Sequence, residues 1–400
     1  MGRPVLTVEV VETNRIAFLD VLRGVALFGI LLVNVFSFGA DYPAWSGVSD
    51  QLAWQVKHVF FETKFWMLYS VLFGMGFLLQ TQSPDYTIAR SLRRLGVLML
   101  LGCLHGLLFE GDILMLYAEL GVLLLLLYRL PTKWLLSLAI LLALSFPLGH
   151  LLGGDRGDDW PAENAAEATF WLEEDRAESP LAVASFTEVL AYHAGFLPER
   201  FWADWQYPDS GFLVLACFLI GYCLMRSGWG VMERLAPAKS VQIALGLWGL
   251  GLSLMAIEGY WSATMAYAPF ERSDATSMQV LGGDLVYLVA TLSLTGAWFL
   301  SVWCWAQSRR LVGVRGLIAS AGQMSLTGYL TQTVMFTTVF YGYGLGAAFE
   351  WGPAQVVGFA VGVYALQVVL CHCWMQRFRR GPLEWLWRCL TYWRWEPMRR

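Results

Sequence analysis

Histidine and carboxylate side chains come together in one short stretch of this 400-residue sequence. His105 lies between the small residues Cys103 and Gly106, and two acids, Glu110 and Asp112, follow it closely. A carboxylate that accepts a hydrogen bond from an imidazole fixes its tautomer and stabilises the imidazolium, so such a pair can act as a general base. We predict that Asp112 or Glu110 orients His105 as a base. A hydrogen-bonded packing role is the alternative for this histidine.

Three more ionisable residues, His58, Glu62 and Lys64, stand at the start of another apolar stretch. His58 and Glu62 are one helical turn apart and can share a helix face. Lys64 could extend its ammonium outward to water, or Glu62 could hold it at the mouth of a cavity. Both arrangements remain open at this point.

Strongly polar residues also lie within apolar stretches, where they are costly and therefore candidates for function. Asp20 and Arg23 are three residues apart and can pair on one helix face. Such a pair could be a structural clamp, a cytoplasmic gate or a site for an anionic cofactor. Asn34 follows deep in the same stretch and must bond to a neighbouring helix or face a cavity.

The segment from 322 to 333 is too polar for a helix surface that faces lipid. Gln323, Tyr329 and Gln332 lie close together along it, so we predict that this helix lines a polar cavity. Two aromatic residues complete the candidate binding set. Trp45 lies in a turn where a membrane-interface role is the alternative, and Tyr117 follows shortly after Asp112.

Motifs typical of soluble enzymes are missing. The sequence has no Walker P-loop, no G-x-S-x-G nucleophile elbow, no HExxH and no C-x-x-C pair. Cys371, His372 and Cys373 lack a second ligand pair at zinc-site spacing, and the few histidines are not spaced for haem. We therefore expect neither a metal nor a haem cofactor.

The elements that position these residues must lie in a membrane. Hydrophobic residues make up 57% of the chain and charged residues 14%, against about 45–50% and 25% in a soluble domain. This composition excludes a disordered chain, a nucleic-acid-binding protein and an ordinary cytosolic enzyme. We predict an all-α integral membrane protein with about ten transmembrane helices. The expected spans are 21–40, 59–80, 92–109, 112–128, 134–152, 211–226, 240–258, 281–306, 316–340 and 354–376.

The charge of the loops predicts their orientation. With the N-terminus inside, every second loop carries lysine or arginine, and both termini are then cytoplasmic. The long acidic segment falls outside and divides the chain. We expect an N-terminal five-helix membrane half over 1–152, an acidic extracytoplasmic loop over 153–210 with an interfacial helix and loop at 180–205, and a C-terminal five-helix half with a basic cytoplasmic tail over 211–400.

Several motifs, in order along nearly the whole chain, resemble the YeiB-like family of bacterial inner-membrane proteins. They are Leu19-Asp20-x-Leu22-Arg23-Gly24, the run from Gly29 to Asn34, Lys64-Phe65, Leu72-Phe73-Gly74-x-Gly76, His105-Gly106, Gly111-Asp112, Gly322-Gln323, Tyr329-x-x-Gln332 and the run from Gly381 to Arg388. The first of these motifs and the asparagine that follows are also similar to membrane-embedded acyltransferases such as the lysosomal heparan-glucosaminide acetyltransferase.

This resemblance implies a multi-pass protein of the bacterial inner membrane that moves an acyl group from cytoplasmic acyl-CoA to a small-molecule, lipid or glycan acceptor. Asp20 and Arg23 would bind or gate the CoA side, and Lys64 would stabilise an oxyanion. The lysosomal enzyme has a histidine just after its first motif helix, whereas residues 41 to 45 here contain none. The base would therefore be His105 or His58.

Two other functions use the same residues. A transporter of a small solute or lipid would bind its substrate and protons with these buried polar groups. A structural or sensory membrane protein would use the acidic outer loop as its contact surface. The sequence does not decide between an enzyme and a transporter, and it leaves a homo-oligomer open.

Overall fold

The computed structural model describes residues 6–38, 40, 47–151, 180–206, 208–265 and 277–400. Within these ranges the chain is helical and forms no strand, apart from an isolated bridge between Phe378 and Arg399. The elements up to the acidic segment are α1 (Leu6–Asn34), η1 (Val35–Phe38), α2 (Val48–Val56), the π-helical turn η2 (Lys57–Phe61), α3 (Lys64–Thr81), α4 (Ile88–Gly106), α5 (Leu114–Leu127) and α6 (Thr132–Leu151). The elements after it are η3 (Pro180–Ala182), α8 (Phe186–Gln206), α9 (Pro208–Cys223), η4 (Leu224–Gly228), α10 (Trp229–Arg234), α11 (Pro237–Met265), α12 (Ser277–Gln307), α13 (Val312–Gln323), α14 (Ser325–Phe340), α15 (Pro353–Arg377) and α16 (Pro382–Tyr392).

The predicted all-α class is therefore confirmed for the described residues. In the part of the chain that the structure describes, four helices are long and apolar enough to cross a membrane: Ala17–Phe38, Pro237–Trp261, Leu281–Gln307 and Pro353–Arg377. Shorter apolar helices cover Leu114–Leu127, Thr132–Leu148 and Gly211–Ser227. The count of ten spans and the cytoplasmic termini remain predictions.

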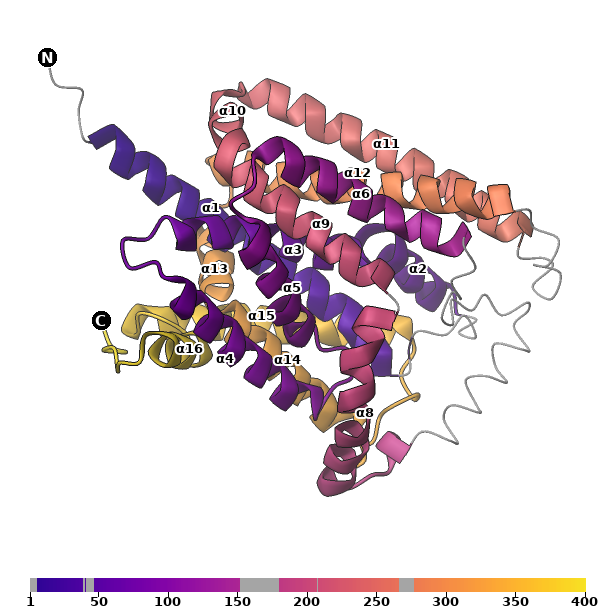
Figure 1. The fold of residues 1–400 in the computed structure, drawn as a ribbon. Coiled ribbons are helices and arrows are strands. Elements are labelled where there is room, and N and C mark those ends of the chain that lie inside the picture. Colours follow the sequence, from indigo (N-terminus) through magenta and orange to yellow (C-terminus); the bar gives the residue numbers. More distant parts are fainter. Residues whose placement is uncertain (1–5, 39, 41–46, 152–179, 207, 266–276) are drawn as a thin grey trace, which may run out of the picture.

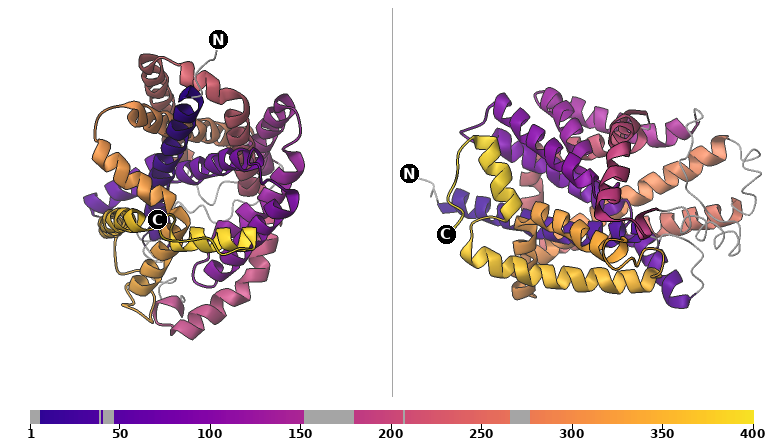
Figure 2. Two further views of the ribbon diagram at one scale, coloured as in Figure 1. Left: turned by 90° about the vertical axis from the view of Figure 1, so that its left-hand side faces the viewer. Right: turned by 90° about the horizontal axis from the view of Figure 1, so that it is seen from below.

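Helix α1 is the central element of the bundle. It packs against α3, α12, α13, α14 and α15, which come from both halves of the sequence. Figure 1 shows α11 and α12 side by side along one edge, with α4, α14 and α16 on the opposite side. Figure 2 shows that the start of α1 and the C-terminus lie at the same end of the molecule.

Two glycines let α1 and α13 approach closely. A Cβ added to Gly24 would collide with the main-chain oxygen of Ile318, and one added to Gly322 would collide with that of Asp20. Small residues at such crossings allow backbones to come together in a membrane environment. The close crossing brings Asp20, in the middle of α1, into contact with Gln323 at the end of α13.

The predicted span 316–340 is two helices rather than one. The helix is interrupted at Met324, which lies between α13 and α14. The carboxylate of Glu384, on α16, accepts hydrogen bonds from the main-chain N–H groups of Leu326 (2.7 Å) and Thr327 (2.9 Å). These donors are unpaired at a helix N-terminus, so Glu384 satisfies groups that the break exposes.

The sequence predicts helix and loop for the segment 180–205, and most of this segment is the helix α8, with Pro198 inside it. The part of the acidic loop from 152 to 179 lies outside the described residues.

Candidate functional site

His105 and Asp112 form a buried pair. The Nδ1 atom of His105 lies 2.7 Å from Oδ1 of Asp112, and the two side chains are only 1% and 0% exposed. The second carboxylate oxygen accepts a hydrogen bond from the main-chain N–H of Met115 at 2.9 Å. An ionised Asp112 accepts a hydrogen bond from Nδ1–H, which leaves Nε2 of the neutral imidazole as an acceptor.

The local sequence explains this pairing. Helix α4 ends at Gly106, directly after His105, and α5 begins at Leu114, directly after the turn that carries Asp112. Gly102 faces the Asp112 carboxylate and the Met115 main chain, where a Cβ would be too close. From α8, Arg200 donates a hydrogen bond to the main-chain oxygen of Asp112. The turn is thus fixed from three sides.

Helix α14 supplies the other side of the site. The hydroxyl of Thr333 lies 2.8 Å from Nε2 of His105 and can donate to it. The ring of Tyr329 is 4.8 Å from the imidazole, centroid to centroid, and its hydroxyl donates to the Gly111 main-chain oxygen at 3.3 Å. Hydroxyl, imidazole and carboxylate thus stand in a row, which is the arrangement that activates a hydroxyl group in many enzymes.

Thr333 was not among the candidates from sequence. It is four residues after Tyr329, so the two side chains share a helix face. The spacing from Tyr329 indicates Thr333 only once His105 is known to face the same helix. Glu110, the alternative acid, is exposed, and its side chain makes no hydrogen bond with His105.

A second polar group joins α1 and α13. Arg23 donates to Oδ1 of Asp20 at 2.8 Å, and Gln323 donates to Oδ2 at 3.0 Å. The predicted pairing of Asp20 with Arg23 is confirmed, and Gln323 belongs to this group rather than to the His105 site. Helix α15 adds a hydrogen bond from Tyr364 to the Gly24 main-chain oxygen.

The other described candidates make their contacts away from His105. Gln332 donates to Gln367 at 2.7 Å, which ties α14 to α15. Tyr117 bonds to Ser70 at 2.6 Å between α5 and α3. Asn34 is the last residue of α1, and Trp45 lies outside the described residues.

His58, Glu62, Lys57 and Lys64 form a separate cluster around the π-helical turn η2. Nδ1 of His58 lies 2.7 Å from Glu62, and Nζ of Lys57 lies 2.9 Å from the other oxygen of the same carboxylate. Lys64 is fully buried and donates to the His58 main-chain oxygen at 2.8 Å, so it does not extend to water. His58 and Glu62 are about 30% exposed, at 28% and 30% of their side-chain surfaces. This second imidazole–carboxylate pair is therefore open, whereas the His105 pair is closed.

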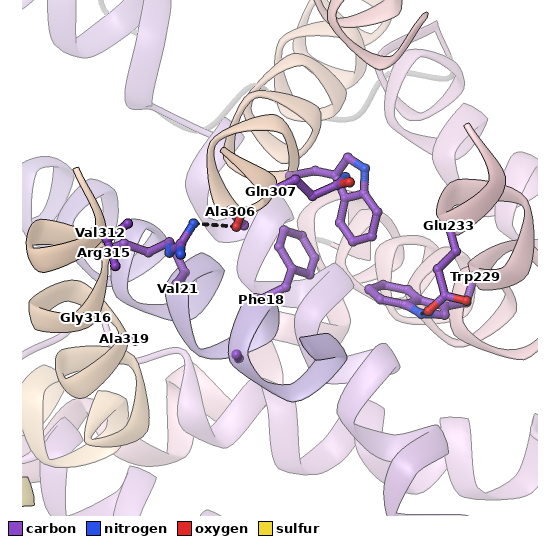
Figure 3. A pocket seen from close by; sticks show the side chains of 12 residues that line it. Phe18, Val21, Trp229, Glu233, Ala306, Gln307, Val312, Arg315, Gly316 and Ala319 are labelled. Carbon is purple, nitrogen blue, oxygen red and sulfur yellow. Dashed lines mark hydrogen bonds between the residues drawn. The ribbon is translucent and has the colours of Figure 1, made fainter. Parts of the chain in front are cut away.

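A cavity of about 700 Å³ lies beside the Asp20 group, between the middle of α1, the start of α13, the end of α12 and α10. In Figure 3 the ring of Phe18 stands near its centre, with Trp229 and Glu233 on one side and Arg315 on the other. Trp229 donates to Glu233 at 2.6 Å, and Arg315 donates to main-chain oxygens at the end of α12. Aromatic walls with polar groups at the edge suit a ligand that is partly apolar.

The part of the chain that the structure describes holds no set of side chains that could bind a metal ion. No group of three His, Cys, Asp or Glu side chains there is close enough to hold an ion. The cysteines are all free thiols.

These features define an all-helical protein, suited to a membrane, with a buried hydroxyl–imidazole–carboxylate row. Residues 224–394 match a family described as a protein of unknown function, DUF418. The chain is 32% identical to the uncharacterized protein YeiB of Escherichia coli, over 93% of this chain and 95% of that one. It is 30% identical to the uncharacterized protein YxaH of Bacillus subtilis, over 99% and 98% of the two chains. No solved structure matches.

The chain therefore belongs to the YeiB-like family. The predicted resemblance to the YeiB-like family is confirmed, and the similarity to membrane-embedded acyltransferases stays a prediction.

Proposed function

We propose that this protein is a multi-pass acyltransferase of the bacterial cytoplasmic membrane. It takes an acyl group from acyl-CoA and transfers it to a hydroxyl or amine of a small-molecule, lipid or glycan acceptor. The observation that carries the proposal is the buried row of Thr333, His105 and Asp112, with distances of 2.8 Å and 2.7 Å.

The row supports general-base catalysis. Asp112 holds the proton on Nδ1, so Nε2 of His105 takes the proton from the acceptor group. The acceptor oxygen or nitrogen then bonds to the thioester carbonyl carbon, and the carbon–sulfur bond breaks. The leaving thiolate takes the proton from the imidazolium and departs as free CoA.

In the structure, the Thr333 hydroxyl occupies the position at Nε2 of His105 that an acceptor hydroxyl would take. The acceptor replaces it there, so Thr333 holds the imidazole in its orientation before the substrate enters. Because His105 is 1% exposed, the reaction requires that α14 or the α4–α5 turn move aside.

The proposed binding site for the acyl-CoA donor lies in a different part of the molecule. Asp20 and Gln323 join α1 to α13, and the cavity around Phe18 lies between the same two helices. Its aromatic walls suit a partly apolar donor. Arg23, paired with Asp20, would bind or gate this end.

The test uses purified protein in proteoliposomes, with radiolabelled acetyl-CoA as donor and an alkyl glucoside and glucosamine as acceptors. We expect free CoA and labelled acceptor from the unchanged protein, and neither from His105→Gln. His58→Gln is the matched control, because His58 makes the same kind of pair with Glu62 in the open cluster. Full transfer by His105→Gln would contradict the assignment, and loss of transfer only in His58→Gln would move the base to His58.

A transporter is the second candidate. The observation that favours it is the break between α13 and α14, because discontinuous helices form substrate sites in many transporters. Counterflow of a labelled solute with no release of CoA would favour transport over transfer.

A further inference from the structure

Three arginines on the first turns of α4 have no acidic partner. Arg90, Arg93 and Arg94 are half-buried, and none of them makes an ion pair or a side-chain hydrogen bond to the described part of the chain. Nε and Nη1 of Arg90 and Nε of Arg93 are buried without an acceptor. Buried donors that lack acceptors are costly, so an acceptor from outside the chain would stabilise them.

Other arginines nearby are satisfied. Arg23 bonds to Asp20, Arg388 bonds to Glu396 at 2.6 Å, and Arg315 bonds to main-chain oxygens. Nε of Arg200 on α8 also lacks an acceptor, but that side chain still donates to the Asp112 main-chain oxygen, whereas Arg90 and Arg93 make no side-chain hydrogen bond to the described residues.

Aromatic rings hold these guanidinium groups in place. Arg94 lies 4.3 Å from the Trp387 ring, and Arg90 lies 4.7 Å from the Tyr392 ring. The Trp387 indole donates to the Arg94 main-chain oxygen at 2.9 Å, which fastens α16 to α4. Stacking on a ring face fixes the plane of a guanidinium and leaves its edge available for an anion.

Arg90, Arg93 and Arg94 concentrate positive charge without an acidic partner of their own among the described residues. Arg94 lies within electrostatic reach of Arg23 and Arg388, both of the same sign. The two acids of the C-terminal segment are already engaged: Glu384 caps α14, and Glu396 binds Arg388. Like charges that the fold brings together are stabilised when a polyanion binds between them.

We infer that the α4 arginines and α16 form a binding site for a ligand that carries phosphate groups with two or more negative charges. Planar guanidinium groups bind phosphate through paired N–H donors, and Arg90 and Arg93 hold N–H donors that lack an acceptor. The phosphates come either from a soluble nucleotide such as coenzyme A or from the headgroup of an anionic lipid. The site stands on these contacts and does not depend on the proposed transfer reaction.

The experiment measures binding to the full-length protein in nanodiscs of phosphatidylcholine. The soluble arm titrates coenzyme A and dephospho-coenzyme A, which lacks one phosphate, by calorimetry. The lipid arm adds phosphatidylglycerol or cardiolipin to the nanodisc and detects retained lipid by native mass spectrometry. We expect saturable binding in one arm, stronger for the probe with more phosphate charge, and weaker at high salt.

Arg90→Gln with Arg94→Gln removes two charges, and we expect affinity to fall by about tenfold or more. Arg94→Lys keeps the charge and separates a folding defect from a loss of charge, because it should retain more affinity than Arg94→Gln. The matched control is Arg309→Gln, an exposed arginine in the turn between α12 and α13. The inference is overturned if neither arm shows saturable binding, or if Arg309→Gln weakens binding as much as the α4 variants do. Because no acyl transfer is measured, failure here is independent of failure of the proposed function.

Discussion

Replacing Asp112 by alanine tests whether the carboxylate holds the buried site together. The change removes the acceptor for Nδ1 of His105 and the acceptor for the Met115 main-chain N–H at once. Both donors stay buried, because the side chains of His105 and Asp112 are 1% and 0% exposed. No water-exposed route remains by which either donor could find a replacement acceptor without movement of the turn.

The size of the effect follows from these two bonds. A hydrogen bond to a charged group contributes about 1.5–3 kcal/mol, and loss of a helix-cap acceptor costs about 1 kcal/mol. We expect Asp112→Ala to lower the free energy of unfolding by about 3 kcal/mol, which raises the unfolding equilibrium constant roughly 100-fold.

The assay is reversible unfolding of the purified protein in mixed micelles, with increasing sodium dodecyl sulfate and tryptophan fluorescence as the readout. Glu110→Ala is the matched control, since Glu110 is an exposed carboxylate two residues away. Its stability should change by less than about 0.5 kcal/mol. Equal effects of the two substitutions, or a change below about 0.5 kcal/mol for Asp112→Ala, would refute the reasoning that Asp112 fixes the turn.

Three further predictions concern other parts of the molecule. Gly322→Ala should destabilise the protein by about 1–3 kcal/mol in the same unfolding assay, because its Cβ would collide with the α1 main chain. Gly313→Ala is the control: a Cβ there meets open space, so the change should be neutral or stabilising. Thr333→Val should keep acyl transfer within about tenfold of the unchanged protein, because the acceptor supplies its own hydroxyl. A labelled acyl–Thr333 adduct found by mass spectrometry would instead show that the Thr333 hydroxyl takes the acyl group. Burial favours the protonated form of Glu396, but hydrogen bonding and charge from Arg388 outweigh it and hold the pKa of that carboxyl below its usual value. The stability that this interaction contributes is present above the unfolded pKa and is lost as the pH falls through the folded pKa. The free energy of unfolding in the same assay should therefore fall with acid, and Arg388→Gln should remove that dependence.

Local patterns in the sequence predicted a good part of the site. Asp20 and Arg23 are one turn apart, and His105 and Asp112 flank a short turn, so sequence proximity and helical geometry are enough to expect both pairs. The helical class followed from composition alone, because so apolar a chain must satisfy its backbone hydrogen bonds within helices.

Contacts between distant segments could not be predicted in the same way. Nothing in the run from 322 to 333 says which of its polar residues faces His105, and it is Thr333 that does so while Gln332 turns to Gln367. The rotation of α14 about its axis is fixed by these hydrogen bonds to α4 and α15 and by its packing against α1 and α16. The cavity around Phe18 was missed for the same reason, since Trp229 and Trp303 reach it from different helices.

The cap that Glu384 places on α14 has a consequence for the order in which the molecule is assembled. Helix α14 carries Thr333 and Tyr329, but the carboxylate that satisfies its first N–H groups is 58 positions later in the chain. During synthesis, α14 leaves the ribosome before that carboxylate exists. Its N-terminus must therefore remain hydrated, or paired with other acceptors, until α16 has been made and has docked. The His105 site can reach its final geometry only after translation of the C-terminal helix, so chains that stop short of residue 382 should insert but lack a formed site.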